Sequence, residues 1–476
     1  MRRPASFSLL GLTAAVLSLG NLTAGDWTHF RGPKTGRATA GAKLPAEIGP
    51  DEHVLWKVET PAGHSSPVIF GDRIFLTGIR DKTLVTFALD RNTGKPLWEQ
   101  VAPHETLEEV HSTGNHAQSS PATDGERVVS FFGSSGLSCY DMDGKLQWQH
   151  RMGPFKNDFG AGSSPLIVDD RVILVQDHDV GSFLAAWDKK SGKLLWRTDR
   201  PDFFRNYCTP TVITVDGKKQ IVIAATLRVV AYDFETGKEL WTVPGLSRVV
   251  CTTPAVGDDG VLYVCGWSAG GGDEGSRIEF DPFDVAIEKL DKDKNGTFEE
   301  DELPKGDLKQ RFTQADYDKD THITKKEYET FRGLFQNSKN AVMAVKPVSG
   351  TSTVPEAKVM WRHEKNVPFC ASPLFADGNL FLVKDGGILT ALDAKSGKPQ
   401  KVARLPATGE YYSSPVAGDG KAYFVNDEGQ LSVISTEGKW EVLHSAEFKE
   451  DVHATPAIVD GKIYLRTGSR LYCFGL

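Results

Sequence analysis

Residues 291–302 place oxygen-bearing side chains at the spacing of a calcium loop. Acidic or amide side chains stand at positions one, three and five, a glycine follows at position six, and a glutamate ends the loop. A hard cation needs six to eight oxygen ligands, and this spacing wraps them around one point. The alternative is a solvated acidic loop. We predict an EF-hand calcium site built from Asp291, Asp293, Asn295, Thr297 through its carbonyl, and Glu302.

A second loop with the same spacing starts 25 residues later, at Asp316 after Asp291. It departs from the pattern at position six, where Thr321 replaces the glycine. That position requires left-handed backbone geometry, which costs a β-branched residue about 1–2 kcal/mol and lowers affinity roughly 5- to 30-fold. Phe298 and Ile323 can pair in a short bridge, so both loops form one module. The predicted ligands are Asp316, Asp318, Asp320, His322 and Glu327.

A repeated pattern surrounds this acidic segment. A Ser/Thr-Pro pair precedes an apolar stretch at Pro67, Pro121, Pro165, Pro210, Pro254, Pro373, Pro415 and Pro456. The spacing is about 44 residues, the usual length of a four-stranded propeller blade, except for one long interval that holds the acidic loops. The eighth repeat lacks a fourth strand, and residues 54–58 form a spare one. We predict an all-β, eight-bladed β-propeller, closed by the N-terminal strand, with a small α-helical EF-hand insertion in blade five.

Hairpins such as Leu84–Trp98 (LVTFALDRNTGKPLW) and Gly181–Trp196 (GSFLAAWDKKSGKLLW) recur within these repeats. Their Asp-x-x-Ser/Thr-Gly-Lys turn and closing tryptophan resemble the pyrroloquinoline-quinone-like (PQQ-like) propeller repeat. The opening DWTHFRGP is similar to that of exported, BamB-like repeat proteins of bacteria. The resemblance covers nearly all of the chain outside the signal peptide and the insertion, and it implies the fold. The family contains both quinoprotein dehydrogenases and non-catalytic scaffolds. The tryptophans at one repeat position are expected to pack between blades: Trp56, Trp98, Trp148, Trp196 and Trp241.

The N-terminus has the features of an export signal, with Arg2 and Arg3 before the apolar stretch Phe7–Gly20. We predict a signal peptide over 1–24, a first propeller part over 25–267, the EF-hand pair over 268–340, and a second propeller part over 341–476. The expected protein is soluble and periplasmic or extracellular. It has no cysteine for a lipid anchor and no transmembrane segment. Its net charge of −8 disfavours nucleic acid as a partner.

The residue three positions before each of these prolines is expected at the mouth of the central channel. The alternative is that these residues form ordinary solvated turns. The polar members are candidates for binding a ligand. These candidates are His64, Gln118, Tyr207, Tyr412 and His453, and the remaining mouth residues are Gly162, Cys251 and Cys370.

Residues 104–116 contain three histidines and three glutamates. A transition-metal site is one interpretation, but the spacing lacks a tight ligand pattern, so a polar loop is favoured. The six cysteines include no adjacent pair and no CxxC motif. Buried free thiols are at least as well supported as disulfides.

Two functions are compatible with the predicted propeller and its calcium loops. One is a non-catalytic binding or scaffold protein, with calcium as its ion and a protein or envelope partner on the face that bears the insertion. The other is a PQQ- and calcium-dependent dehydrogenase that oxidises an alcohol or sugar. Such enzymes commonly hold the quinone with a disulfide between adjacent cysteines, and this chain has no Cys-Cys pair. The scaffold interpretation is therefore preferred, and PQQ is not favoured as a cofactor.

Overall fold

The computed structural model describes residues 25–39, 41, 43–271, 277–350, 352–353 and 359–476. The predicted signal peptide, 1–24, lies outside the described residues. Within the described part of the chain, no helix is long and apolar enough to cross a membrane.

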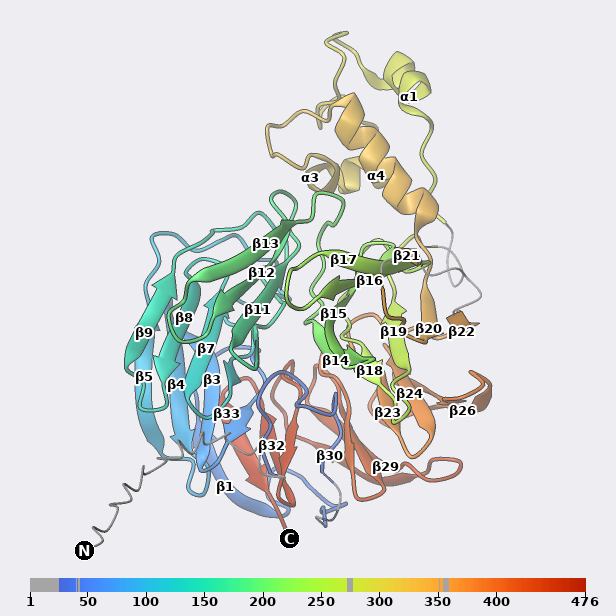
Figure 1. Ribbon diagram of the computed structural model, residues 1–476. Coiled ribbons are helices and arrows are strands. Elements are labelled where there is room, and N and C mark those ends of the chain that lie inside the picture. The colour runs from blue at the N-terminus through green and yellow to red at the C-terminus, as the bar shows by residue number, and fades with distance from the viewer. Residues whose placement is uncertain (1–24, 40, 42, 272–276, 351, 354–358) are drawn as a thin grey trace, which may run out of the picture.

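Eight antiparallel β-sheets are arranged around a central axis as the blades of a propeller, which confirms the predicted blade number (Figure 1). Blade one contains β2 (Val68–Phe70), β3 (Arg73–Arg80), β4 (Thr83–Asp90) and β5 (Pro96–Ala102), and blade two contains β6 (Ala122–Thr123), β7 (Arg127–Phe132), β8 (Gly136–Asp141) and β9 (Leu146–His150). Blade three contains β10 (Leu166–Val168), β11 (Arg171–Gln176), β12 (Phe183–Asp188) and β13 (Leu194–Asp199), and blade four contains β14 (Thr211–Val215), β15 (Lys218–Ala225), β16 (Arg228–Asp233) and β17 (Glu239–Pro244). Blade five contains β18 (Ala255–Val256), β19 (Leu262–Gly266), β20 (Ala341–Val345) and β22 (Val359–His363), and blade six contains β23 (Leu374–Ala376), β24 (Asn379–Lys384), β25 (Ile388–Asp393) and β26 (Pro399–Arg404). Blade seven contains β27 (Val416–Gly418), β28 (Lys421–Val425), β29 (Gln430–Ser435) and β30 (Val442–Glu447), and blade eight contains β31 (Ala457–Val459), β32 (Lys462–Arg466), β33 (Arg470–Phe474) and β1 (Val54–Glu59). The short β21 (Ser352–Thr353) adds to blade four in parallel with β17.

The last blade combines both ends of the propeller sequence. β1 pairs antiparallel with β33, with Val54 opposite Phe474 and Glu59 opposite Arg470. The innermost strands β31 and β2 of blades eight and one also contact each other. Chain segments more than 400 residues apart are therefore joined in one sheet.

The Ser/Thr-Pro motif forms a ring of hydrogen bonds around the channel. At seven of the eight blade junctions, a backbone N–H of one blade donates to the hydroxyl before the proline of the next. For example, Ser66 N–H donates to Ser120 Oγ at 2.8 Å, and Thr455 N–H donates to Ser66 Oγ at 2.9 Å. At the junction of blades four and five, Thr211 Oγ1 donates to the carbonyl of Pro254 instead, at 3.3 Å. The motif thus satisfies buried polar groups where neighbouring blades meet.

The repeated tryptophans and turn glycines pack together between blades. A Cβ at Gly94 would lie 2.7 Å from the ring of Trp56, and the Trp56 indole N–H donates to the Arg91 carbonyl at 3.1 Å. The same arrangement recurs at Trp98, Trp148, Trp196 and Trp361, each against the turn of the following blade. Glycine is required there because the turn has positive φ and lies against the ring.

Trp241 differs from the other repeated tryptophans. Its indole N–H donates at 2.8 Å to Gln220 Oε1 in its own sheet. β21 pairs directly beside it, with Ser352 opposite Trp241. The irregular connection after β20 therefore replaces the usual turn from the next blade.

Residues 26–38 cross the channel between the inner strands of the blades. Trp27 forms a bridge with Ile69 in blade one, and Arg37 forms one with Ala417 in blade seven. Between them, the fully buried Arg31 donates to the Pro373 carbonyl at 2.8 Å. No sequence pattern predicted that this segment would cross the channel.

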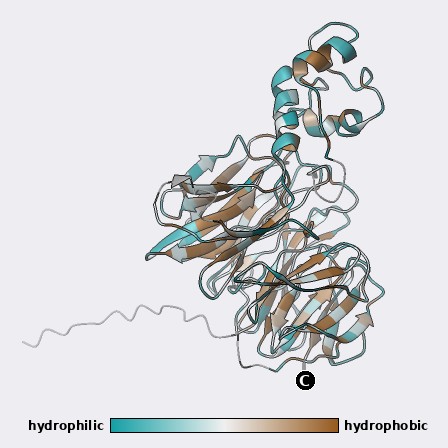
Figure 2. Ribbon diagram, turned by 90° about the vertical axis from the view of Figure 1, so that its right-hand side faces the viewer, coloured by the Kyte–Doolittle hydropathy of each residue, from teal (hydrophilic) through white to brown (hydrophobic). Residues whose placement is uncertain are grey.

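The residues between β19 and β20 form a small helical unit that stands away from the blades (Figures 1 and 2). It contains α1 (Phe283–Leu290), α2 (Asp307–Gln310), α3 (Phe312–Ala315) and α4 (Lys325–Asn337). Its own apolar core includes Phe298, Ile323, Phe331 and Phe335. A capping box between Thr324 and Glu327 begins α4. We refer to residues 268–340 as the insert.

Candidate functional site

The first acidic loop, Asp291–Glu302, directs its carboxylates toward one point. Oxygen atoms of Asp291, Asp293 and Glu302 lie within 4.8 Å of one another. The Asp291 carboxylate accepts from the N–H of Gly296 at 2.9 Å, and Glu302 accepts from the N–H of Lys292 at 2.6 Å. These bonds fold the loop around its own acidic side chains. Asn295 and Thr297 lie on the same loop, where the Asn295 amide oxygen accepts from the N–H of Thr297 at 2.9 Å.

The second acidic loop, Asp316–Glu327, repeats this arrangement. Oxygen atoms of Asp316, Asp318 and Asp320 lie within 4.8 Å of one another. Asp316 accepts from the N–H of Thr321 at 3.1 Å, as Asp291 does from Gly296 in the first loop. Glu327 accepts from the N–H of Tyr317 at 3.0 Å. The structure therefore brings each loop's acidic groups together.

Thr321 adopts the left-handed backbone that its position in the loop requires, with φ of 74°. The corresponding Gly296 has φ of 88°. In this geometry the Cβ of a threonine lies too close to the backbone, which destabilises the loop by about 1–2 kcal/mol relative to glycine. The second loop is thus held in a more strained conformation than the first.

The two loops are joined back to back. Phe298 and Ile323, both fully buried, exchange two backbone hydrogen bonds of 3.1 and 2.9 Å. Beside this bridge, His322 Nδ1 lies 2.5 Å from a Glu299 carboxylate oxygen. Hydrogen bonds from Asn295 and neighbouring groups lower the pKa of Glu299 to about 2, and the Glu299 carboxylate raises the pKa of His322. The His322 side chain therefore bonds the first loop, although its backbone belongs to the second.

The insert also contacts the propeller directly. The Arg205 guanidinium binds Asp179 and, at 2.6 Å, Asp158 in the propeller, and donates to the Thr313 carbonyl of the insert at 3.2 Å. The Phe204 and Tyr317 rings stack at 4.7 Å. The carboxylates of Asp179 and Asp158 counteract burial and raise the pKa of Arg205. A polar contact to α3 and an aromatic contact to the second loop therefore link the insert to the loops of blades three and four.

A cavity of about 560 Å³ lies at the channel end next to the insert. All eight residues that stand three positions before the repeat prolines line it, including every predicted channel candidate: His64, Gln118, Gly162, Tyr207, Cys251, Cys370, Tyr412 and His453. Phe30, from the segment that crosses the channel, is also part of its wall. Trp267, the residue before the insert, lines the same cavity, so the insert stands beside its mouth.

The cavity wall is aromatic and acidic. Phe159, Tyr207, Trp267, Phe369 and Tyr412 supply ring surface, and Asp385 and Glu410 supply carboxyl groups. None of the described residues that line the cavity is a lysine or an arginine. Burial raises the pKa of Asp385 and of Tyr207. A ligand that brings positive charge suits this wall better than an anion does.

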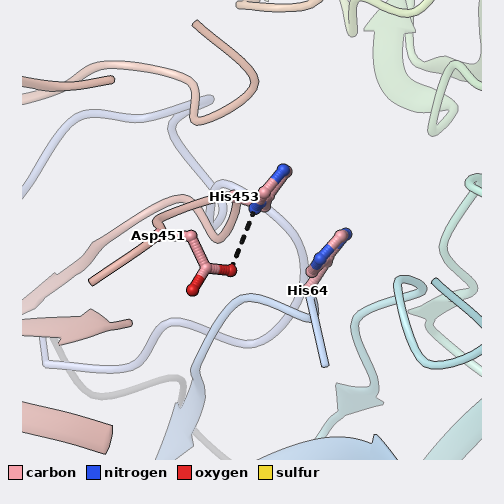
Figure 3. A group of neighbouring side chains, drawn as sticks. All are labelled: His64, Asp451 and His453. Atoms are coloured by element: carbon pink, nitrogen blue, oxygen red, sulfur yellow. Dashed lines mark ion pairs between the residues drawn. The ribbon is translucent and has the colours of Figure 1, made fainter. Parts of the chain in front are cut away.

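One side of the cavity carries a stack of three rings. The His64 and His453 imidazoles are parallel, with centroids 3.9 Å apart and an angle of 3° between their planes. Tyr412 stacks on the other face of His453 at 5.0 Å. Burial, together with electrostatic repulsion from His453 and Arg466, lowers the pKa of His64 to about 3, and burial lowers the pKa of His453. Asp451, which sequence analysis did not identify, lies next to this stack (Figure 3).

The histidine-rich loop before blade two does not assemble into a metal site among the described residues. His116 Nε2 instead bonds the backbone carbonyl of Glu108 at 2.9 Å, and His111 bonds Thr113 Oγ1 at 3.0 Å. Burial raises the pKa of the Glu108 carboxyl. Of this loop, only His111, Thr113 and Gly114 reach the cavity wall.

The cysteines are all free thiols in the structure. Cys139, Cys208, Cys265 and Cys473 are buried, and burial raises the pKa of each thiol. Cys251 and Cys370 face the cavity from neighbouring blades. Equivalent positions in two repeats explain why residues so far apart in sequence lie on one wall.

Comparison with known proteins supports the same architecture. The family profile described as outer membrane protein assembly factor BamB matches residues 46–196 and 88–266. No curated protein sequence matches the chain significantly. Among solved structures, BamB from Moraxella catarrhalis is 12% identical with a TM-score of 0.56, covering 89% of this chain and 99% of that one. Quinohemoprotein alcohol dehydrogenase from Comamonas testosteroni is 13% identical with a TM-score of 0.58, covering 94% and 80%.

At these identities the structural likeness shows the fold and not the activity. The same fold is present in an assembly factor and in an alcohol dehydrogenase. Together with the eight sheets and the repeated hairpins, the profile match identifies the fold of this chain as a PQQ-like β-propeller.

Proposed function

We propose that this chain is an exported, calcium-binding β-propeller that acts as a non-catalytic binding or scaffold protein. The observation that carries the calcium proposal is the convergence of Asp291, Asp293 and Glu302, with oxygen atoms within 4.8 Å of one another. Like charges at this separation repel, and a bound divalent cation removes that repulsion. The matching geometry of the second loop supports an EF-hand pair inserted in blade five. The strand pairing of β1 with β33 supports a propeller closed by its N-terminal strand.

The partner is proposed to be a protein or another component of the cell envelope that contacts the face bearing the insert. Between residues 268 and 340 there are 18 acidic and 12 basic residues, a net charge of −6. Calcium in the two loops would neutralise part of this charge at the surface beside the cavity. Export is supported by the basic residues and apolar stretch of the N-terminal sequence.

The calcium proposal is tested with the double variant Asp291→Ala, Glu302→Gln. We expect calorimetric titration to show loss of the tighter calcium site, while the far-ultraviolet circular dichroism of the propeller is retained. The matched control is Glu300→Gln, Asp301→Asn, which also removes two charges from the loop at positions outside the proposed ligand set. If the control loses calcium to the same extent, general acidity and not the EF-hand geometry binds the ion.

A PQQ-dependent dehydrogenase is the alternative, and the cavity fits this cofactor poorly. PQQ carries three carboxylates, which require cationic partners when they leave water. The described cavity wall contributes Asp385 and Glu410 but neither lysine nor arginine. We expect calorimetric titration of PQQ into the calcium-loaded protein to give no saturable heat. Saturable micromolar binding would overturn the non-catalytic proposal and justify a screen of alcohol and sugar substrates.

A further inference from the structure

His64, Asp451 and His453 form a compact group of metal-ligating side chains at the rim of the cavity. One donor atom from each lies within 4.8 Å of the other two. His64 comes from blade one, and Asp451 and His453 precede blade eight, so the group spans the junction where the two ends of the propeller meet (Figure 3). We propose that these three residues bind one divalent first-row transition metal ion, with Zn²⁺ as the probe. The site is separate from both acidic loops and does not depend on calcium binding there.

The donor set selects a transition metal and not calcium. Imidazole nitrogen suits zinc, copper, iron and nickel, whereas calcium prefers oxygen ligands alone. Three protein ligands, two of them histidine and one carboxylate, leave further coordination positions for water or another ligand. Because His64 and His453 line the cavity wall, these open positions face a space of about 560 Å³.

The distances require only side-chain movement. His453 Nδ1 lies 3.7 Å from Asp451 Oδ2, as the dashed line in Figure 3 marks. Tetrahedral ligands at about 2.1 Å from a metal are roughly 3.4 Å from one another. Imidazole lone pairs lie in the ring plane, so the parallel rings of His64 and His453 cannot both bind one ion until one of them turns about its Cβ–Cγ bond. Metal binding must therefore break the ring stack seen in the structure.

The surroundings keep the donors available. His453 Nδ1 is buried without a hydrogen-bond partner, and the side chain is 16% exposed. A Cβ at Gly468 would lie 2.2 Å from Asp451 Oδ1, so a glycine makes the space that the carboxylate occupies. The Arg466 guanidinium donates to the carbonyls of Pro61, Ser65 and Thr77. Its positive charge helps to lower the pKa of His64. Asp385 and Glu410 place further negative charge on the cavity wall.

The test is a titration of Zn²⁺ into the full chain in the presence of saturating calcium, followed by Co²⁺ absorption spectroscopy of the same sample. We expect one Zn²⁺ to bind and Co²⁺ to give the visible bands of a low-coordinate nitrogen–oxygen site. His453→Ala and His64→Ala should each weaken binding at least about 100-fold. Asp451→Asn should weaken it by about 10- to 100-fold.

His111→Ala is the matched control, because His111 lines the same cavity but lies outside the group. It should leave the Zn²⁺ affinity unchanged. The Asp451 side chain is 62% exposed, so Asp451→Asn is expected to fold normally even if a histidine variant does not. The proposal is overturned if Asp451→Asn and His453→Ala bind Zn²⁺ as wild type does. It is equally overturned if His111→Ala weakens binding as much as they do.

Discussion

Lys319, in the second acidic loop, lies with its ammonium nitrogen 3.3 Å from a carboxylate oxygen of Asp179 in the propeller. Asp179 is completely buried and also binds the Arg205 guanidinium. Two cations from different parts of the chain therefore share one buried carboxylate. This contact fixes the second loop to blade three, so the insert is docked on the propeller as well as joined to it by the chain.

Arg205→Met should release the insert from the propeller. The substitution leaves Asp179 with one of its two cations, and breaking a buried ion pair in this way costs about 3–5 kcal/mol. We expect a lower free energy of unfolding and faster hydrogen exchange at residues 312–324. Lys319→Met is the control, with an expected loss below about 1 kcal/mol because Lys319 is partly solvated. Unchanged exchange in Arg205→Met would mean that the remaining contacts, among them Lys319 with Asp179, hold the insert without Arg205.

Thr321→Gly should tighten calcium binding at the second loop. Glycine adopts the required positive φ without strain, so about 1–2 kcal/mol, or roughly 5- to 30-fold in affinity, is recovered. Gly296→Thr is the reciprocal change, at a position where nothing lies within 4 Å of an added Cβ. It should weaken the first loop by a similar factor, as read by calorimetric titration. Equal affinities before and after both changes would show that backbone strain does not set the difference between the loops.

Much of the fold was predictable because each blade repeats the same local chemistry. The Ser/Thr-Pro pairs and the Asp-x-x-Ser/Thr-Gly turns mark strand ends, and their spacing predicted eight blades. The channel candidates followed from the same register, since His64 and Tyr207 occupy equivalent positions in different blades. Residues without a repeat equivalent were the ones that were missed.

The segment that crosses the channel shows why such residues were missed. Arg31 donates to the carbonyl of Pro373, 342 positions away, and no local pattern encodes such a partner. Asp451 was missed for a similar reason, because it stands two residues before the repeat position that drew attention to His453. The docking of Lys319 on Asp179 likewise depends on how the insert folds back over the blades.

The ring of hydrogen bonds around the channel predicts that two buried serines of the repeat motif, Ser66 and Ser163, contribute differently to stability. Ser66 Oγ accepts from the Thr455 N–H at 2.9 Å, so Ser66→Ala leaves a buried donor unsatisfied and should cost about 1–3 kcal/mol. Ser163 is equally buried, but its hydroxyl has no partner. Ser163→Ala should therefore be neutral or slightly stabilising. Chemical denaturation of both variants measures the difference, and equal losses would show that the ring contributes nothing specific to closure between blades eight and one.

His178 predicts a pH dependence of stability. Burial lowers its pKa from 6.5 to about 4, and its ring stacks on Phe155 at 4.1 Å. Below pH 6.5 the unfolded chain binds a proton at this imidazole, whereas the folded chain does not until the pH falls to about 4. The free energy of unfolding must therefore decrease as the pH is lowered from 6.5 to about 4, by roughly 3 kcal/mol in total from this group.

His178→Phe keeps a ring against Phe155 and removes the titrating group. Whatever its stability at pH 7.5, the variant should lose less free energy of unfolding than wild type between pH 6.5 and 4, as measured by urea denaturation at each pH. His29, whose pKa burial also lowers to about 4, keeps part of the dependence in the variant. Parallel curves for the two proteins would mean that His178 gains its proton without unfolding, through local opening of the loop that carries it.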